Sequence, residues 1–590
     1  MLKWKLKKTP IEPFSFSFLK DYLENLGIKE TNSFIMEPLP SDEEPYENLD
    51  NIKEACMELY NAFEADKKFF LQVDSDADGY TSSAIFYGFF KSLYPNARIE
   101  WRLHDGKEHG ILLDTIPIDA DIIVIPDAGS MQFDEQEQLA NQGRKVIVLD
   151  HHNIGSNYPK FENVIIVNNQ SSKNFKNKFL SGAGVVYKTI QAFNTIYSEK
   201  FPKIYEKFSD LAAVGIIADM MDTRELDNNY IIRKGLKNII NPMFKALLEK
   251  QAYSVSSVDN PNKIDIAFYI APLVNGVIRF GTAEEKEILF GGLINYESNQ
   301  VIITKYRGVD RKENYYDYIA RTSANVRARQ NREKEKSMNF LKERIEKNNL
   351  HEHQLLIVKT SKEDEITVPH TITGLVAMEL LKIYKRPTLV LRPKSDGNGG
   401  IVYAGSGRAK ANGDFDSLFG MLRESKLCEF VEGHDMAHGV AITEENLPKV
   451  IEFANNYLKD IEFDVTEVEV DFEFHNSNIN QEMLREFGKA IHLYGNGIPQ
   501  PKFAFDLRIA KDSIRFMGKN NDTMKFSAMG VDFIKFRCKD LIEEIEESNT
   551  HLFNIRAVGR SQINEWRGNE TTQIMIDEIE LSSIKIEDLF

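Results

Sequence analysis

Three short, mainly apolar runs in the first third of the chain are each followed by acidic side chains. The runs cover residues 69–73, 122–126 and 146–149, and Asp74, Asp127 and Asp150 come directly after them. Short apolar runs that alternate with helical patterns predict buried strands of a parallel α/β sheet. Because the carboxyl ends of parallel strands meet at one edge, we expect a ligand site at that edge.

The remaining pattern divides the chain into further parts. Residues 1–55 carry little pattern and begin with Lys3, Lys5, Lys7 and Lys8, which favours a frayed terminus over a binding arm. Residues 56–315 alternate strands with helices and form the α/β core. Residues 316–350 contain no helix breaker and predict a long connecting helix. Residues 351–462 then predict a second α/β domain, with strands at 354–358 and 387–392.

From residue 463 to residue 590 the pattern changes to alternation of apolar and polar side chains. This alternation is typical of half-buried antiparallel strands. The expected strands lie at 465–474, 502–509, 513–518, 522–527, 531–539 and 572–581, with a helix at 481–493. So many short strands in one segment favour a small β-barrel.

The composition limits the number of domains and the cellular setting, but it does not indicate a function. A chain of 590 residues predicts about four domains at roughly 150 residues each. Its three cysteines, Cys56, Cys428 and Cys538, are too widely spaced for a disulfide framework or a zinc motif, which fits a reducing cytoplasm. We find no signal segment and no run of about 18 apolar residues, so we expect neither export nor membrane insertion.

The candidate chemistry lies in four motifs. They are Asp74-Ser-Asp76-Ala-Asp78-Gly79, Asp127, Asp150-His151-His152, and the helical run that ends in Asp219. Clustered carboxylates and imidazoles are stable together mainly when divalent cations neutralise them, and this ligand set suits Mn²⁺ or Mg²⁺. A calcium loop starting at Asp74 is excluded, because its twelfth position is Ile85 rather than glutamate. Metal-assisted phosphoester hydrolysis is the reaction class that we infer.

The net charge of −17 is the strongest objection to a nucleic-acid substrate, since phosphate binding needs basic side chains. A local basic groove would be enough. The connecting helix is the candidate wall, with nine basic and four acidic residues between Arg321 and Lys347. The alternative reading is a solvated helix held by pairs such as Glu343–Lys347.

The order of these motifs resembles the DHH phosphoesterase superfamily and, within it, the RecJ-type single-strand-specific exonucleases. Further matching segments extend the resemblance from about residue 45 to the end of the chain. They are 182–185, 275–279, 405–408, 433–434 and 494–499. The resemblance implies a DHH catalytic core, a DHH-associated second domain and a C-terminal domain of the OB-fold type.

The resemblance also implies roles for individual residues. The metal ligands would be Asp76, Asp78, Asp127, His151 and Asp219, with Asp127 bridging two Mn²⁺ ions (Mg²⁺ is the alternative) and Asp74 on or beside one ion. Asp150 would orient His151 through a hydrogen bond, and His152 would contact the scissile phosphate or the attacking water. Asn275, Arg279, Ser406, Arg408 and His434 would hold the DNA strand, and Trp566 is an aromatic candidate in the barrel.

Two segments depart from the family pattern. Downstream of the first motif the family tends to have a Gly-Tyr-Gly turn, whereas this chain has His109-Gly110. The family usually shows Gly-Gly-His followed by Ala-Ala-Gly, whereas this chain has Glu432-Gly433-His434-Asp-Met-Ala437-His438-Gly439. None of the inferred metal ligands is lost, so we expect an active enzyme.

The function that the resemblance implies is hydrolysis of single-stranded DNA from its 5′ end to 5′-mononucleotides, in DNA repair or recombination. We expect a cytoplasmic monomer encoded by a bacterium or a bacteriophage, working with a single-strand-binding protein and a helicase. Two alternatives stay open: a phosphodiesterase for short oligonucleotides or cyclic dinucleotides, and a non-catalytic scaffold of a replication or repair assembly.

Overall fold

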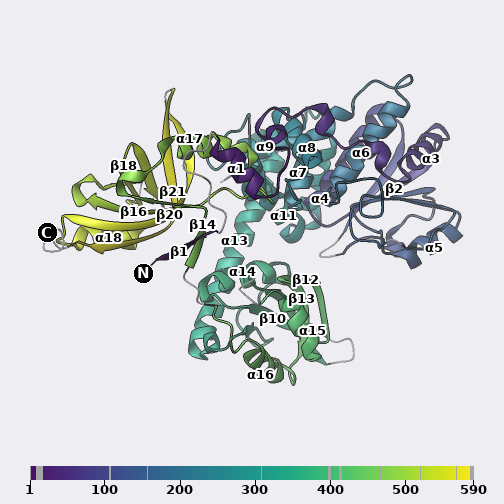
Figure 1. The fold of residues 1–590 in the computed structure, drawn as a ribbon. Coiled ribbons are helices and arrows are strands. Elements are labelled where there is room, and N and C mark those ends of the chain that lie inside the picture. The colour runs from purple at the N-terminus through teal and green to yellow at the C-terminus, as the bar shows by residue number, and fades with distance from the viewer. Residues whose placement is uncertain are drawn as a thin grey trace.

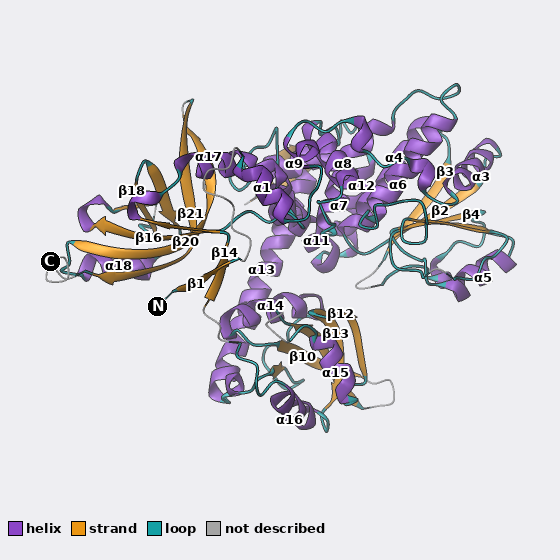
Figure 2. Ribbon diagram, viewed as in Figure 1, coloured by secondary structure: helices purple, strands orange, loops and turns teal. Residues whose placement is uncertain are grey.

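The computed structural model describes residues 2–7, 17–104, 108–155, 157–306, 308–395, 400–410, 415–463, 467–518, 520–566 and 568–584. Figure 1 shows three bodies, with the long helix α13 (Tyr315–Lys347) between two of them. Strands gather in each body, as the colouring in Figure 2 makes clear. Within the described parts of the chain, every helix is too short or too polar to span a bilayer.

The first body is built on a five-stranded, all-parallel sheet in the order β3-β2-β4-β5-β6. Its strands are β2 (Lys68–Val73), β3 (Arg98–Leu103), β4 (Ile122–Pro126), β5 (Lys145–Asp150) and β6 (Val164–Asn168). Alternate side chains of the central strands enter two different cores; Leu71 faces one and Phe70 the other. Burial on both faces explains why these strands are mainly apolar.

Helices cover the sheet and complete this domain. Those nearest the sheet are α3 (Ile52–Glu64), α4 (Ala77–Leu93), α5 (Phe133–Asn141) and α6 (Gly182–Ile196). The rest are α7 (Ser209–Ala218), α8 (Leu226–Lys237), α9 (Pro242–Lys250), α10 (Lys263–Asp265), α11 (Ala271–Phe280) and α12 (Ala283–Ile294). A hairpin of β7 (Val301–Tyr306) and β8 (Val309–Asn314) leads into α13.

The connecting helix α13 joins two hydrophobic cores. Ile319 and Val326 belong to the core of the first domain, whereas Leu341 and Ile345 belong to a core of the second. Four of its nine basic side chains form ion pairs with acidic residues of other elements. These pairs are Arg321–Glu313, Arg329–Glu285, Lys334–Glu379 and Arg344–Asp364. The four charges therefore fix the helix to its neighbours and do not form a free basic wall.

The second domain contains a mixed sheet in the order β12-β13-β11-β10-β9, in which only β9 and β10 are parallel. Its strands are β9 (Leu356–Lys359), β10 (Thr388–Ser395), β11 (Ile401–Arg408), β12 (Phe430–His434) and β13 (Ala437–Thr443). Helices α14 (Thr373–Tyr384), α15 (Leu418–Ser425) and α16 (Leu447–Tyr457) complete it.

The C-terminal domain has a seven-stranded sheet in the order β15-β16-β20-β21-β19-β18-β17. The strands are β15 (Phe472–His475), β16 (Phe503–Ala510), β17 (Arg515–Met517), β18 (Thr523–Ala528), β19 (Val531–Lys535), β20 (Leu552–Trp566) and β21 (Asn569–Ser583). Its helices are α17 (Gln481–Lys489) and α18 (Lys539–Glu547). Strand β20 and helix α18 were not among the elements expected from the pattern.

The prediction of a frayed N-terminus is wrong. Strand β1 (Lys3–Leu6) pairs in parallel with β14 (Glu467–Val470), and the Arg556 guanidinium lies 3.9 Å from the centre of the Trp4 ring. Helices α1 (Phe18–Asn25) and α2 (Thr31–Ile35) bury apolar side chains in the core of the C-terminal domain. The sequence pattern does not reveal these elements, because they are short and their partners lie more than 400 residues away in the sequence.

Candidate metal centre

The sheet edge brings the predicted acidic and imidazole residues together. Asp74 follows β2, Asp127 follows β4, Asp150 ends β5 with His151 and His152 after it, and Asp219 follows α7. Three overlapping groups have ligand atoms that all lie within 4.8 Å of one another. They are Asp74–Asp76–Asp127, Asp78–His151–Asp219 and Asp127–Asp150–His151–His152.

Asp78 is held by the first turn of α6. Its carboxylate accepts hydrogen bonds from Ser181 Oγ (2.9 Å) and from the backbone N–H groups of Gly182 (2.7 Å) and Ala183 (3.1 Å). A carboxylate is favoured there because the N–H groups of a first helical turn have no partner within the helix. The close approach also requires a glycine, since a Cβ on Gly182 would lie 2.3 Å from Asp127 Oδ1.

Asp74 is held by two histidines, His104 and His109, which the sequence motifs did not indicate as its partners. Its oxygens lie 2.9 Å from His109 Nδ1 and 3.3 Å from His104 Nδ1, and accept a 3.1 Å hydrogen bond from the Gly110 N–H. Burial raises the pKa of Asp74, but the hydrogen bonds from the two histidines outweigh it and lower that pKa to about 2. His104 directly follows β3, so a search for polar residues just after the strand at residues 98–103 could have found it.

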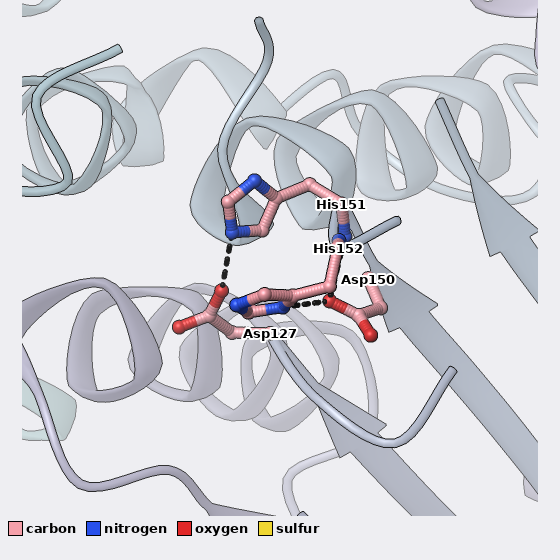
Figure 3. Close-up of side chains that lie close together, drawn as sticks. All are labelled: Asp127, Asp150, His151 and His152. Carbon is pink, nitrogen blue, oxygen red and sulfur yellow. Dashed lines mark hydrogen bonds and ion pairs between the residues drawn. The ribbon is translucent and has the colours of Figure 1, made fainter. Parts of the chain in front are cut away.

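Asp150 contacts the second histidine of its motif rather than the first. Figure 3 shows the His152 ring against Asp150, with Nδ1 2.8 Å from Oδ1. The described contacts of Asp150 with His151 involve only the His151 backbone N–H, at 2.7 Å, so the predicted hydrogen bond from Asp150 to the His151 ring is wrong. Burial opposes a charge on His152, but the hydrogen bond to Asp150 raises its pKa to about 9.

Asp127 lies at the centre of the cluster. It adopts a left-handed backbone conformation (φ 64°), which is uncommon for residues other than glycine, and it is 2% exposed. The ring Nε2 of His151 lies 3.2 Å from its Oδ1 and 3.4 Å from Asp219 Oδ2, yet Oδ1 accepts no hydrogen bond in the described part of the chain. Burial, then repulsion from Asp78 and Asp76, raises the pKa of Asp127 well above its usual range.

The electrostatics of the remaining candidate ligands agree with a cation site. Burial and the nearby carboxylates raise the pKa of Asp219 to about 8, and burial and the charge of Asp74 raise that of Asp76. Burial lowers the pKa of His151, which leaves a neutral imidazole that can bind a metal. Crowded carboxylates with a buried oxygen that lacks a partner fit divalent cations, whose charge removes this repulsion.

Asn275 and Arg279 on α11 lie beside this centre. The side-chain oxygen of Asn275 accepts a 3.1 Å hydrogen bond from the Ala77 N–H, so it supports the loop that carries Asp76 and Asp78. The charge of Arg279 acts on Asp76 and also on Arg408 of the second domain. Residues of the two domains are therefore close to one another at this point.

The other candidates for substrate binding differ in position. Ser406 on β11 is buried and its Oγ lies 2.9 Å from Thr373 Oγ1, and Arg408 ends the same strand. His434 ends β12 with an exposed side chain, and no contact described for it reaches the metal ligands. Trp566 ends β20 at a hairpin tip, and its side chain lies outside the described part of the structure.

Comparisons with known proteins place the chain in a family. Residues 68–216 match the DHH family, N-terminal domain, and residues 470–578 match the RecJ OB domain. The chain is 36% identical to the putative SPbeta prophage-derived single-strand DNA-specific exonuclease YorK of Bacillus subtilis, over 98% of both chains. It is also 24% identical to the single-stranded-DNA-specific exonuclease RecJ of the same organism, over 92% of this chain and 65% of that one.

Solved structures agree in fold. RecJ of Thermus thermophilus in complex with Mn²⁺ superimposes with a TM-score of 0.69, at 21% identity, over 95% of this chain and 75% of that one. The expected fold class is thereby confirmed: a parallel-sheet DHH core, a second α/β domain and a C-terminal domain of the OB type. The similarity to YorK covers nearly the whole chain, and the protein belongs to the RecJ-type exonucleases of the DHH family.

Proposed function

We propose that the protein is a two-metal exonuclease that hydrolyses single-stranded DNA from the 5′ end and releases 5′-mononucleotides. The observation that carries this proposal is the pair of ligand groups Asp74–Asp76–Asp127 and Asp78–His151–Asp219, which meet where His151 Nε2 lies 3.2 Å from Asp127 Oδ1. Two adjacent groups with one carboxylate between them suit a pair of bridged ions. Mn²⁺ is the proposed ion, with Mg²⁺ as the alternative.

Each residue has a defined task in this proposal. Two bound ions would activate a water molecule and stabilise the leaving oxygen. Asp127 would bridge them, and the neutral His151 would bind one of them. The Asp150 carboxylate contacts Nδ1 of His152. Nε2 of His152 would then be available to contact the scissile phosphate. His104 and His109 keep Asp74 ionised beside the ions.

A phosphate contact next to the ions supports a nucleic-acid substrate in spite of the net charge. Neither Arg279 nor Arg408 has a carboxylate at ion-pairing distance among the described residues. Burial and the nearby charge of Arg279 lower the pKa of Arg408. The two cations therefore lie close enough to repel each other. An anionic strand would relieve this repulsion, with Ser406 as a further donor and Asn275 fixing the loop. His434 remains a proposed contact from the end of the largely exposed strand β12.

The polarity, the mononucleotide product and a role in repair or recombination rest on the family resemblance and on the names of the relatives. The same basis supports a cytoplasmic monomer that works with a single-strand-binding protein and a helicase. Trp566 is proposed as a stacking residue on the hairpin of β20 and β21.

The test uses a 30-mer single strand labelled separately at each end, with Mn²⁺. We expect loss of the 5′ label as a mononucleotide and progressive shortening of the 3′-labelled strand. Asp127→Ala should reduce the rate by at least about 100-fold. Loss of a residue that only supports a metal ligand costs up to about 100-fold in activity, and Asp127 is itself a proposed ligand. Asp134→Ala changes an exposed aspartate of α5 and should leave the rate unchanged.

The same experiment separates the alternatives. With a dinucleotide as a second substrate, cleavage of the dinucleotide alone would identify an oligonucleotide phosphodiesterase. Binding of the 30-mer without cleavage of either substrate would identify a scaffold. Mn²⁺ should also raise the melting temperature of the wild type more than that of Asp127→Ala, because a bound ion stabilises the folded state. This second readout does not depend on finding the correct substrate.

A further inference from the structure

The segment that follows Asp219 is held by a turn of the C-terminal domain. The backbone oxygen of Asn496 in that turn accepts hydrogen bonds from the Thr223 N–H (2.9 Å) and from Thr223 Oγ1 (2.8 Å). Its side-chain Nδ2 donates to the backbone oxygen of Met220. Two domains that are far apart in the sequence therefore meet one residue away from a metal ligand.

The end of α7 needs such support. The Met221 N–H donates to Ile216 O, and the Met220 N–H donates to Ile217 O. These are the two hydrogen bonds of a Schellman motif, in which a left-handed residue ends the helix. Glycine usually occupies that left-handed position, but here it is Met220, with φ 56°. A side chain at this backbone angle is unfavourable, so contacts from outside the helix must maintain it.

Asp219 has little support of its own. Its side chain is 31% exposed, and His151 is the partner described for it, at 3.4 Å. By contrast, several backbone and side-chain donors hold Asp74, Asp78 and Asp150. The position of the Asp219 carboxylate therefore depends on the backbone that follows it.

Two backbone hydrogen bonds close the turn that supplies Asn496. Gly495 N–H bonds to Ile498 O (2.9 Å) and Ile498 N–H to Gly495 O (3.2 Å), which closes a turn over Asn496 and Gly497. Gly497 has φ 83°, and a Cβ there would lie 2.0 Å from Asp222 Oδ1. The turn thus fits closely against the catalytic domain, and only glycine allows this approach.

The turn is also anchored in its own domain. The hydroxyl of the buried Tyr494 donates to Phe487 O of α17 at 2.8 Å, and Tyr494 and Ile498 lie in the C-terminal core. Leu226 and Ile264 of the catalytic domain pack against that same core. Movement of the C-terminal domain would therefore reach Met220 through packed and hydrogen-bonded contacts.

We propose that Asn496 is a positioning residue: from the C-terminal domain, it holds the backbone after Asp219 so that the Asp219 carboxylate completes the metal centre. This inference rests on the proposed metal site and extends it to a residue outside the catalytic domain. It assigns the C-terminal domain a part in metal binding, in addition to contact with the DNA strand.

The test measures Mn²⁺ binding to the full-length protein by titration calorimetry, without DNA. Asn496→Ala should bind Mn²⁺ about 10-fold more weakly, the lower end of the range for loss of a group that orients a ligand. Thr223→Val removes one of the two donors to Asn496 O and should have a smaller effect in the same direction. Asn549→Ala changes an exposed loop asparagine of the same domain and should bind as the wild type does.

Rates on the 30-mer at increasing Mn²⁺ then separate positioning from a loss of folding. For Asn496→Ala we expect the Mn²⁺ concentration for half-maximal rate to rise, the maximal rate to recover at saturating Mn²⁺, and KM for DNA and the melting temperature to stay close to the wild type. Unchanged Mn²⁺ affinity, or a change in KM or melting temperature alone, would overturn the proposal. If the wild-type protein binds Mn²⁺ but neither it nor any variant cleaves DNA, the proposed exonuclease function is wrong. The calorimetry then still tests this inference, because it measures Mn²⁺ affinity without DNA.

Discussion

At the scale of single residues, the proposed metal centre depends as much on the absence of side chains at two glycines as on the carboxylates themselves. Asp127 and Asp78 are buried in close contact with neighbouring helices, and their oxygens occupy the space where a Cβ on Gly182 or Gly215 would lie, 2.3 Å away in both cases. Such contacts leave no room for relaxation, because protein interiors are close-packed.

Gly182→Ala should therefore disable the centre without altering any ligand. The new methyl group would displace Asp127, and a misplacement of about 1 Å can reduce a rate by about 100-fold. The measurements are the rate on the 30-mer and Mn²⁺ binding by calorimetry. Gly439→Ala is the matched control, since the nearest atom to a Cβ there is 3.6 Å away. Equal rates for the two variants would contradict the role given to Gly182.

His438 predicts a pH dependence of stability. Burial, with the charge of Arg408, lowers its pKa to about 4, below the value of about 6.5 for an exposed histidine. Between these values the unfolded chain binds a proton that the folded chain does not, so stability rises with pH across that window and is lost on acidification.

His438→Leu should remove this contribution. We expect the melting temperature of the variant to fall less than that of the wild type between pH 7 and pH 4.5, as measured by circular dichroism of the full-length protein. The two proteins losing stability in parallel would show that His438 is protonated in the folded state at the lower pH.

At the scale of elements, the sequence pattern located the strands that carry the ligands. Strands β2, β4 and β5 are apolar on both faces, so their pattern is strong and their ends are well defined. The pattern did not predict β1, α1 or α2, because each is short and its main partners lie in the distant C-terminal domain. Short helices gain most of their stability from tertiary packing.

Leu23 of α1 tests this assignment. It is fully buried in the core of the C-terminal domain, and Leu23→Ala should destabilise that domain by about 2–5 kcal/mol. Hydrogen exchange should then increase in α17 and β16, whereas the strands of the catalytic sheet keep their protection. Leu39→Ala, at a side chain that is 59% exposed, is the control. Faster exchange in the catalytic sheet instead would place α1 in the other domain.

At the scale of the whole molecule, the N-terminal segment and the C-terminal domain form one packing unit. Strand β1 pairs with β14, and the Tyr22 hydroxyl donates to Pro499 O at 2.8 Å. Figure 1 shows both ends of the chain on the same body. Strand β1 and helices α1 and α2, all inside the extension predicted for residues 1–55, therefore pack with the C-terminal domain.

A truncation series checks this unit. Deleting residues 463–590 alone exposes Phe18, Leu19 and Leu23, so we expect most of that protein to be lost on centrifugation after expression. Deleting residues 1–36 as well removes those side chains and should restore the recovery. Equal recovery of the two truncated proteins, measured by size-exclusion chromatography, would show that α1 does not depend on the C-terminal domain.

The sequence by itself determined the sheet, the order of the ligand-bearing motifs and the family, because apolar strand patterns and carboxylates at strand ends are local features of the chain. Tertiary structure decided which atoms meet: that Asp150 holds His152 rather than the ring of His151, that His104 and His109 support Asp74, and that Asn496 bonds to the backbone after Asp219. These contacts join segments whose sequence separation carries no periodic signal. Only the packing of the folded domains brings them within hydrogen-bonding distance.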